Sequence, residues 1–105
     1  MAKLISIFWR DIPAQVVGRG ARNRIRQELE PRFAKAIDRA AMRAGRGSSD
    51  AYLADWRRVT EIVEGDLEAL VRERVAQLES RFPDAYLEQV VKAGGVEPQK
   101  GEEQA

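Results

Sequence analysis

Basic side chains cluster around a glycine-containing turn in the first part of the chain. The guanidinium group suits bidentate contacts with phosphate and carboxylate oxygens. With Trp9 or Trp56 beside it, a basic hairpin around Gly20 could follow a phosphate backbone and stack a base. A solvated arginine face on an edge strand is the alternative interpretation. The candidate residues for contact with nucleic acid are Arg19, Arg22, Arg24 and Arg26.

An aromatic residue, a cation and an anion follow one another where the first apolar run ends. Trp9, Arg10 and Asp11 could form a corner that binds a ligand or a partner protein. Alternatively, Arg10 and Asp11 pair to close a turn while Trp9 lies in the core. The full set of candidate partner- or ligand-binding residues is Trp9, Arg10, Asp11, Gln15, Arg39, Arg43, Trp56 and Arg57.

Catalytic chemistry finds little support in the residue types. The chain has no cysteine and no histidine, so a disulfide scaffold, a zinc finger, a thiol nucleophile and a Ser-His-Asp triad are excluded. The carboxylates show neither metal-loop nor paired spacing. Gly18-Arg19-Gly20 lacks the third glycine and the following helix of a dinucleotide site. We therefore expect no enzymatic activity, no cofactor and no bound metal.

The charge is divided unevenly over the 105 residues. Residues 1–60 contain thirteen Lys and Arg against six Asp and Glu, whereas residues 61–105 contain five against eleven, for a net charge of +1. The two halves could neutralise each other, or the basic half could face an acidic partner. No apolar run reaches the roughly 18 residues that cross a bilayer. We expect a cytoplasmic protein without membrane contact.

Alternation of apolar and polar residues predicts three strands before the first helix. Residues 4–9 are apolar on both faces, which indicates a central strand covered on both sides. Pro13 is expected to separate this strand from a second one at residues 14–19. Residues 22–29 alternate with one polar face, which is typical of a strand near a sheet edge.

Helical periodicity begins at Pro31. Residues 31–44 carry an apolar stripe at helical spacing, and a short helix is expected at residues 51–56. Residues 57–64 could extend this helix or form a fourth strand. We favour the strand because Val59 and its neighbours are β-branched and Gly65 follows.

The last part of the chain predicts two further helices. Asp66 is expected to cap a helix that reaches Phe82, and a final helix spans residues 85–93. Residues 94–105 are polar and predict a disordered tail. The sequence therefore predicts one α+β domain over residues 1–93, with a small, mainly antiparallel sheet of three to four strands. Helices pack on this sheet in the order β-β-β-α-(β)-α-α.

Three segments resemble a small bacterial domain family catalogued as "virulence factor". They are residues 7–16, residues 33–45 and residues 50–57, and the likeness covers roughly residues 4–65. The resemblance associates such chains with folate- or corrinoid-linked methyl-transfer enzymes. It implies no catalytic residues.

Together, these features favour a non-enzymatic accessory or protein-interaction module. Its partner would be a larger protein or a second copy of the chain. Nucleic-acid binding through the basic hairpin at residues 19–26 is one alternative. A role as a small subunit or partner of a folate or corrinoid one-carbon enzyme is another, and it depends on the resemblance alone.

Overall fold

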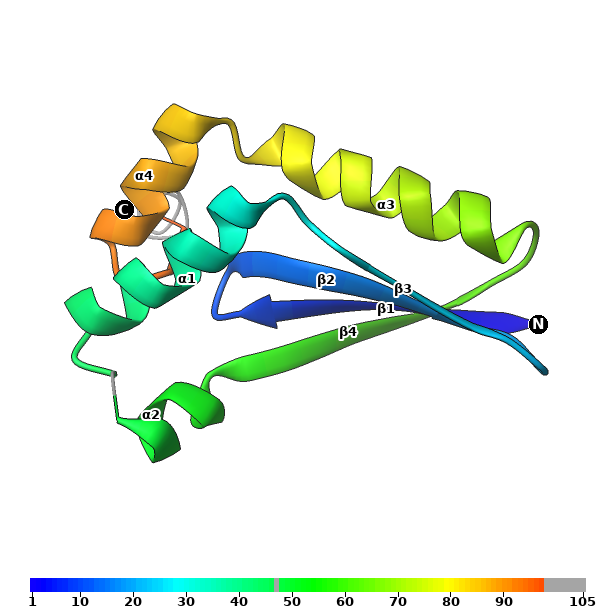
Figure 1. Ribbon diagram of the computed structural model, residues 1–105, viewed down its shortest axis with the longest axis horizontal. Coiled ribbons are helices and arrows are strands. Elements are labelled where there is room, and N and C mark those ends of the chain that lie inside the picture. The colour runs from blue at the N-terminus through cyan, green and yellow to red at the C-terminus, as the bar shows by residue number, and fades with distance from the viewer. Residues whose placement is uncertain (47, 98–105) are drawn as a thin grey trace, which may run out of the picture.

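The computed structural model describes residues 1–46 and 48–97, and it is an α+β fold (Figure 1). This confirms the predicted fold class. The elements in chain order are β1 (Ala2–Trp9), β2 (Ile12–Arg19), β3 (Arg24–Glu28), α1 (Pro31–Arg43), α2 (Ser49–Ala54), β4 (Trp56–Val63), α3 (Leu67–Arg81) and α4 (Asp84–Lys92).

The strands form one four-stranded antiparallel sheet in the order β3-β2-β1-β4. The strand interpretation of residues 57–64 is confirmed, because β4 pairs with β1 from Trp9↔Trp56 to Ala2↔Val63. Gly65 then turns the chain at φ +121°, a conformation that favours glycine. β3 lies at an edge, as its polar alternation predicted.

Pro13 does not separate the first two strands, so this expectation is wrong. β2 already begins at Ile12, and Pro13 pairs with Phe8 next to an irregularity in the register between Ile7 and Phe8. β3 pairs with β2 only from Gln15 onward. Pro13 therefore has a neighbouring strand on one side only, where the sheet tolerates a residue that lacks an N–H.

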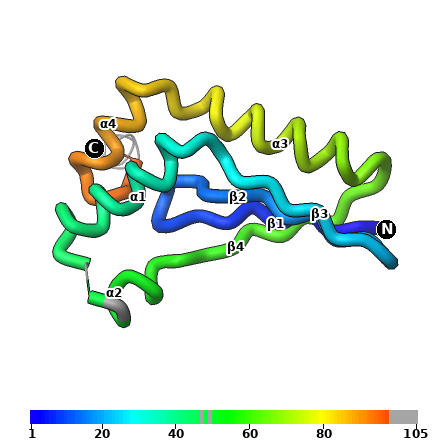
Figure 2. The backbone as a smooth tube through the Cα atoms, viewed as in Figure 1, coloured from blue at the N-terminus to red at the C-terminus, as the bar shows by residue number. Residues whose placement is uncertain are grey.

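One face of the sheet is covered along its length by a helix, whereas the other face is covered only at one end, where Tyr52 of α2 packs on Trp9. The expectation that the first strand is covered on both sides therefore holds only at that end. α3 runs along the first of these faces, while α1 and α4 lie together at the end of the sheet near the β1–β2 turn (Figures 1 and 2). Gly18 permits the close approach of α3, because a Cβ atom there would lie 2.7 Å from Val71 Cγ2 and 2.9 Å from Leu67. Alternate residues of the strands face α3, and the others face away.

The core lies between the covered face of the sheet and the helices. Its largest fully buried side chains include Trp9, Phe33 and Phe82. Phe33 of α1 contacts Phe82 edge to face, with ring centroids 6.2 Å apart. This contact packs α1 against the end of α3, where the chain turns into α4.

The folded chain continues past the predicted start of the tail at residue 94. The backbone N–H of Gly95 donates to Val90 O at 2.8 Å, and the Asp11 N–H donates to Gly95 O at 2.8 Å. The Glu97 N–H donates to Asp11 Oδ2 at 2.8 Å. Residues 94–97 thus pack on the β1–β2 turn, whereas residues 98–105 lie outside the described part of the chain.

Candidate functional site

The β1–β2 corner brings together Trp9, Arg10 and Asp11, but it directs them inward. Trp9 is fully buried; its ring stacks on Tyr52 at 6.0 Å, and its indole Nε1–H donates to Tyr52 O at 2.9 Å. This aromatic residue offers no surface to a partner. It joins α2 to the sheet.

Arg10 bridges two segments that are distant in sequence. Its Nε donates to Asp55 Oδ2 at 3.2 Å, and its guanidinium also donates to Gly94 O at 3.0 Å. Arg46 Nε binds the same Asp55 oxygen at 2.9 Å. Burial raises the pKa of Asp55, but the hydrogen bonds and charges of Arg46 and Arg10 outweigh it and hold that pKa below its usual range.

Asp11 and Arg57 complete this corner. Arg57 donates to Asp11 Oδ1 at 3.2 Å and to Arg10 O at 2.7 Å, and its guanidinium lies 4.6 Å from the Phe8 ring centroid. The Asp11 side chain is 8% exposed. This corner therefore holds β4 and residues 94–97 on the β1–β2 turn. Trp9 lies in the core, as the structural alternative expected, but the ion pairs differ from that alternative: Arg10 pairs with Asp55 and Asp11 pairs with Arg57.

Arg39 and Arg43 lie elsewhere, on α1 where it faces α4. Arg39 makes a bidentate pair with Glu88 at 2.9 and 2.6 Å, and these hydrogen bonds hold the pKa of Glu88 below its usual range. Both arginines, with Lys92 and Val91, line a hollow of about 290 Å³. The residues that line this hollow do not include Trp9, Arg10 or Asp11.

Gln15 and Trp56 meet at a different place, on the side of the sheet that faces away from α3. They line a cavity of about 400 Å³ together with Tyr52 and the beginning of α1. The Gln15 carbonyl oxygen Oε1 is buried without a hydrogen-bond partner in the described part of the chain.

We use the term open face for the side of the sheet opposite α3. The strand register places three rows on it: Arg24, Arg19, Lys3 and Ile62; then Arg26, Val17, Ile5 and Thr60; then Glu28, Gln15, Ile7 and Arg58. Ile5 and Val17 are nearly buried at its centre, and the basic side chains are exposed. The open face is therefore mainly basic around a small apolar centre.

The basic side chains of the open face have no anionic partner among the residues that the structure describes. Within residues 1–46 and 48–97, no carboxylate forms an ion pair with Lys3, Arg19, Arg24, Arg26 or Arg58. The two halves of the chain thus neutralise each other only in part. Arg32–Asp84 and Arg39–Glu88 do join them.

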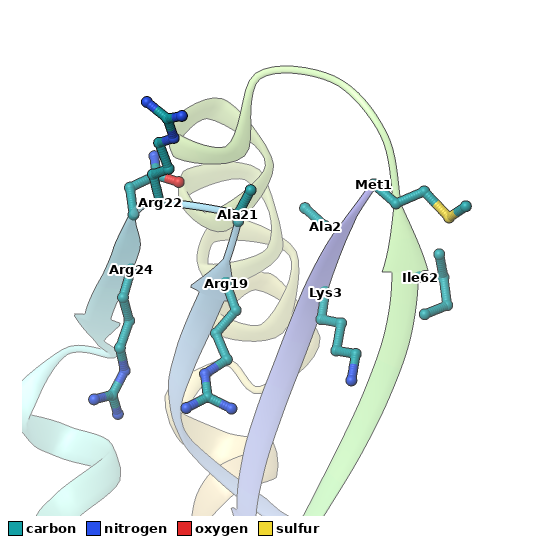
Figure 3. Close-up of a pocket in the computed structure, with 10 residues that line it drawn as sticks. Met1, Ala2, Lys3, Arg19, Ala21, Arg22, Arg24 and Ile62 are labelled. Carbon is teal, nitrogen blue, oxygen red and sulfur yellow. The ribbon is translucent and has the colours of Figure 1, made fainter.

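One end of the open face is hollowed into a shallow groove of about 750 Å³. Arg19, Arg24 and Lys3 extend in the same direction on the side of the strands away from α3, while Arg22 points away from them at the rim (Figure 3). Ile62, which is 63% exposed, completes the row. The arginines of this groove are among the residues that the sequence predicts for contact with nucleic acid.

Lys3 and Arg58 were missed as candidate residues. Lys3 follows the period-two pattern of β1 and could have been placed on the face of Ile5 and Ile7. Arg58 could not, because only the register of β4 against β1 puts it there.

Comparison with known proteins identifies the family of the chain. A family model described as "Virulence factor" matches residues 7–91. No curated protein and no solved structure matches. Among the described residues, no helix is both long and apolar enough to span a bilayer, and no three metal-ligating side chains gather.

Proposed function

The chain belongs to the virulence factor family, and we propose that it is a non-enzymatic binding module that holds single-stranded nucleic acid on the open face. The family name describes no reaction. One observation carries the proposal: Lys3, Arg19 and Arg24 form a row of exposed cations that make no ion pair within residues 1–46 and 48–97, and all three point the same way (Figure 3).

The electrostatics of the molecule favour a polyanion at this surface. Other arginines, such as Arg32 and Arg74, are used for internal pairs with carboxylates. The cations of the open face are unpaired in the described part of the chain, and bringing them together costs repulsion that a row of phosphates would relieve. Ile62 in the same row offers apolar contact to a base. The surface thus combines the charge and apolar area that single-strand binding uses.

The test is fluorescence anisotropy with a labelled single-stranded oligonucleotide of mixed sequence, as RNA and as DNA. If about five cations contact phosphates, affinity should fall about 100-fold between roughly 50 and 200 mM salt. The triple variant Lys3→Ala, Arg19→Ala, Arg24→Ala should flatten the logarithmic salt slope by about 2, at ~0.7 per lost contact.

The matched control is Lys35→Ala, Arg72→Ala, Lys92→Ala. These side chains are also basic, without an ion pair in the described part of the chain, and the net charge changes equally. The control should bind like the wild type. Equal losses in both variants, or no binding of either oligonucleotide at low salt, would contradict the proposal.

Docking on a protein is the second candidate function, and the open edge of β4 favours it. β4 pairs with β1 on one side only, and its Val59 and Ile62 are exposed. An edge strand of this length can pair with a strand of a larger protein or of a second copy. A monomer by light scattering, together with no stoichiometric partner in a pull-down from the native host, would count against it.

A role beside a folate or corrinoid one-carbon enzyme stays a prediction from the family resemblance. The described geometry supplies no argument for that partner. Full activity of the candidate enzyme after deletion of this chain would contradict it.

A further inference from the structure

We propose that the cavity between the open face, α1 and α2 is a binding site for a cationic N–H donor, a guanidinium or primary ammonium group. The cavity holds about 400 Å³, which is in the range of small-ligand sites. This inference does not depend on nucleic-acid binding, because it concerns the opposite end of the open face and the opposite charge.

The polar groups that line the cavity call for a donor. Gln15 lines the cavity, and its carbonyl oxygen is buried without a partner in the described chain, which is unfavourable for a hydrogen-bond acceptor. Glu28 and Asp38 add carboxylates at the rim, and both side chains belong to exposed residues. An N–H group that enters would donate a hydrogen bond to the Gln15 carbonyl oxygen, and it would lie between two negative charges.

The charge of the lining also selects a cation. No lysine or arginine is among the residues that line the cavity. The charge of Asp38 also reaches Tyr52 in the wall of the cavity. Burial raises the pKa of the Tyr52 hydroxyl most, and the negative charge of Asp38 raises it further. An anionic ligand would be repelled by Glu28 and Asp38.

The apolar wall suits the flat or alkyl part of such a ligand. Tyr52 and Trp56 meet edge to face, with ring centroids 5.8 Å apart at 86°, and both rings border the cavity. Aromatic faces attract a guanidinium or ammonium group by cation–π interaction. Leu29 and Ile37 provide the surface on which an alkyl stem can lie.

The same head group could come from a free amine or from an arginine or lysine side chain of a polypeptide. Binding is followed by the ¹H–¹⁵N signal of the Trp56 indole, which lines the cavity. The free probes are butylguanidinium and butylammonium, with butanol as the neutral control. The peptide probes are Gly-Arg-Gly and its neutral citrulline counterpart. Cationic probes should shift the Trp56 signal and neutral ones should not. A clear preference for Gly-Arg-Gly over butylguanidinium indicates a polypeptide source.

Two variants separate a binding role from a structural one. Gln15→Leu removes the unpartnered acceptor, so it should increase resistance to urea while it weakens cation binding by about tenfold. Asp38→Asn keeps the shape, and it should weaken binding at unchanged stability. Glu73→Gln, an exposed acid on α3, is the matched control and should bind like the wild type.

Equal shifts with butylguanidinium and butanol would overturn the proposal, as would wild-type binding by Asp38→Asn. The variant Lys3→Ala, Arg19→Ala, Arg24→Ala should keep cation binding intact. Failure of this site and failure of nucleic-acid binding are therefore distinguishable.

Discussion

Arg10 illustrates at the residue scale how one side chain can hold a turn in a conformation that its backbone disfavours. It adopts φ +53°, in the left-handed region, and its guanidinium contacts Asp55, Gly94 and the Trp9 ring. The strain costs on the order of 1–2 kcal/mol, and the charged hydrogen bonds offset it. This corner, which the sequence suggested as a docking site, therefore stabilises the fold.

Two substitutions at Arg10 separate these effects. Arg10→Ala loses the contacts and keeps the strain, so the free energy of unfolding should fall by about 1–3 kcal/mol. Arg10→Gly loses the same contacts but relieves the backbone, and it should be more stable than Arg10→Ala by about 1 kcal/mol. Urea denaturation measures both. An equal or lower stability of Arg10→Gly would show that backbone strain is not stored there.

At the scale of elements, α3 packs closely on β2 because residue 18 of β2 is a glycine, which has no Cβ atom. The Cβ of an alanine at position 18 would lie 2.7 Å from Val71 and 2.9 Å from Leu67. Gly18 therefore sets the distance between the helix and the sheet.

Gly18→Ala should lower the free energy of unfolding by about 1–3 kcal/mol through overpacking. Leu67→Ala alone should also destabilise the protein, because it leaves a cavity. The double variant should cost less than the sum of the two, since the smaller side chain makes room for the new methyl group. Strict additivity in a double-mutant cycle would contradict the close contact.

At the scale of the whole molecule, ion pairs join segments that are distant in sequence, and this makes stability depend on pH. Hydrogen bonds from Arg74 hold the pKa of Glu61 below its usual 4.5, and Arg46 and Arg10 lower that of Asp55 against the effect of burial. The unfolded chain therefore binds protons more readily at these carboxyls. Their contribution to stability is present above about pH 4.5 and is lost as the pH falls through the lowered values.

Thermal unfolding between about pH 6 and pH 3 should show this acid limb. Arg74→Ala should flatten it, because the pKa of Glu61 returns toward its usual value. Arg72→Ala, which removes an exposed arginine of the same helix without an ion pair in the described chain, should leave the slope unchanged. Identical slopes in the two variants would refute the assignment to Glu61.

The dependence of stability on pH in the alkaline range has a different origin. Burial, followed by the hydrogen bond to Glu97 at 2.5 Å, raises the pKa of Tyr86 from 10.0 to about 12. The unfolded chain loses this proton first, so stability is full below pH 10 and declines between about pH 10 and 12. Tyr86→Phe should remove this decline in a denaturation series. A persisting decline in Tyr86→Phe would assign it to another group.

The sequence by itself determined the local structure, because hydrophobic period and chain breakers act within a few residues. The period-two pattern and β-branched residues predicted β4, and the helical stripe from Phe33 predicted α1. The arginines of β2 and β3 on the open face were also predicted, since alternation places Arg24 and Arg26 on one face of β3. The partial likeness to the family at residues 4–65 agreed with a match that extends over residues 7–91.

Only the tertiary structure decided which surfaces are free. Trp9 and Arg10 have the composition of a binding corner, but packing against Tyr52 and Asp55, more than 40 positions away, buries or pairs them. The cavity at Gln15 depends on the register of β2 and on the placement of α1 and α2. Burial and pairing depend on contacts between distant segments, and alternation along a strand cannot tell which of its two faces a helix will cover.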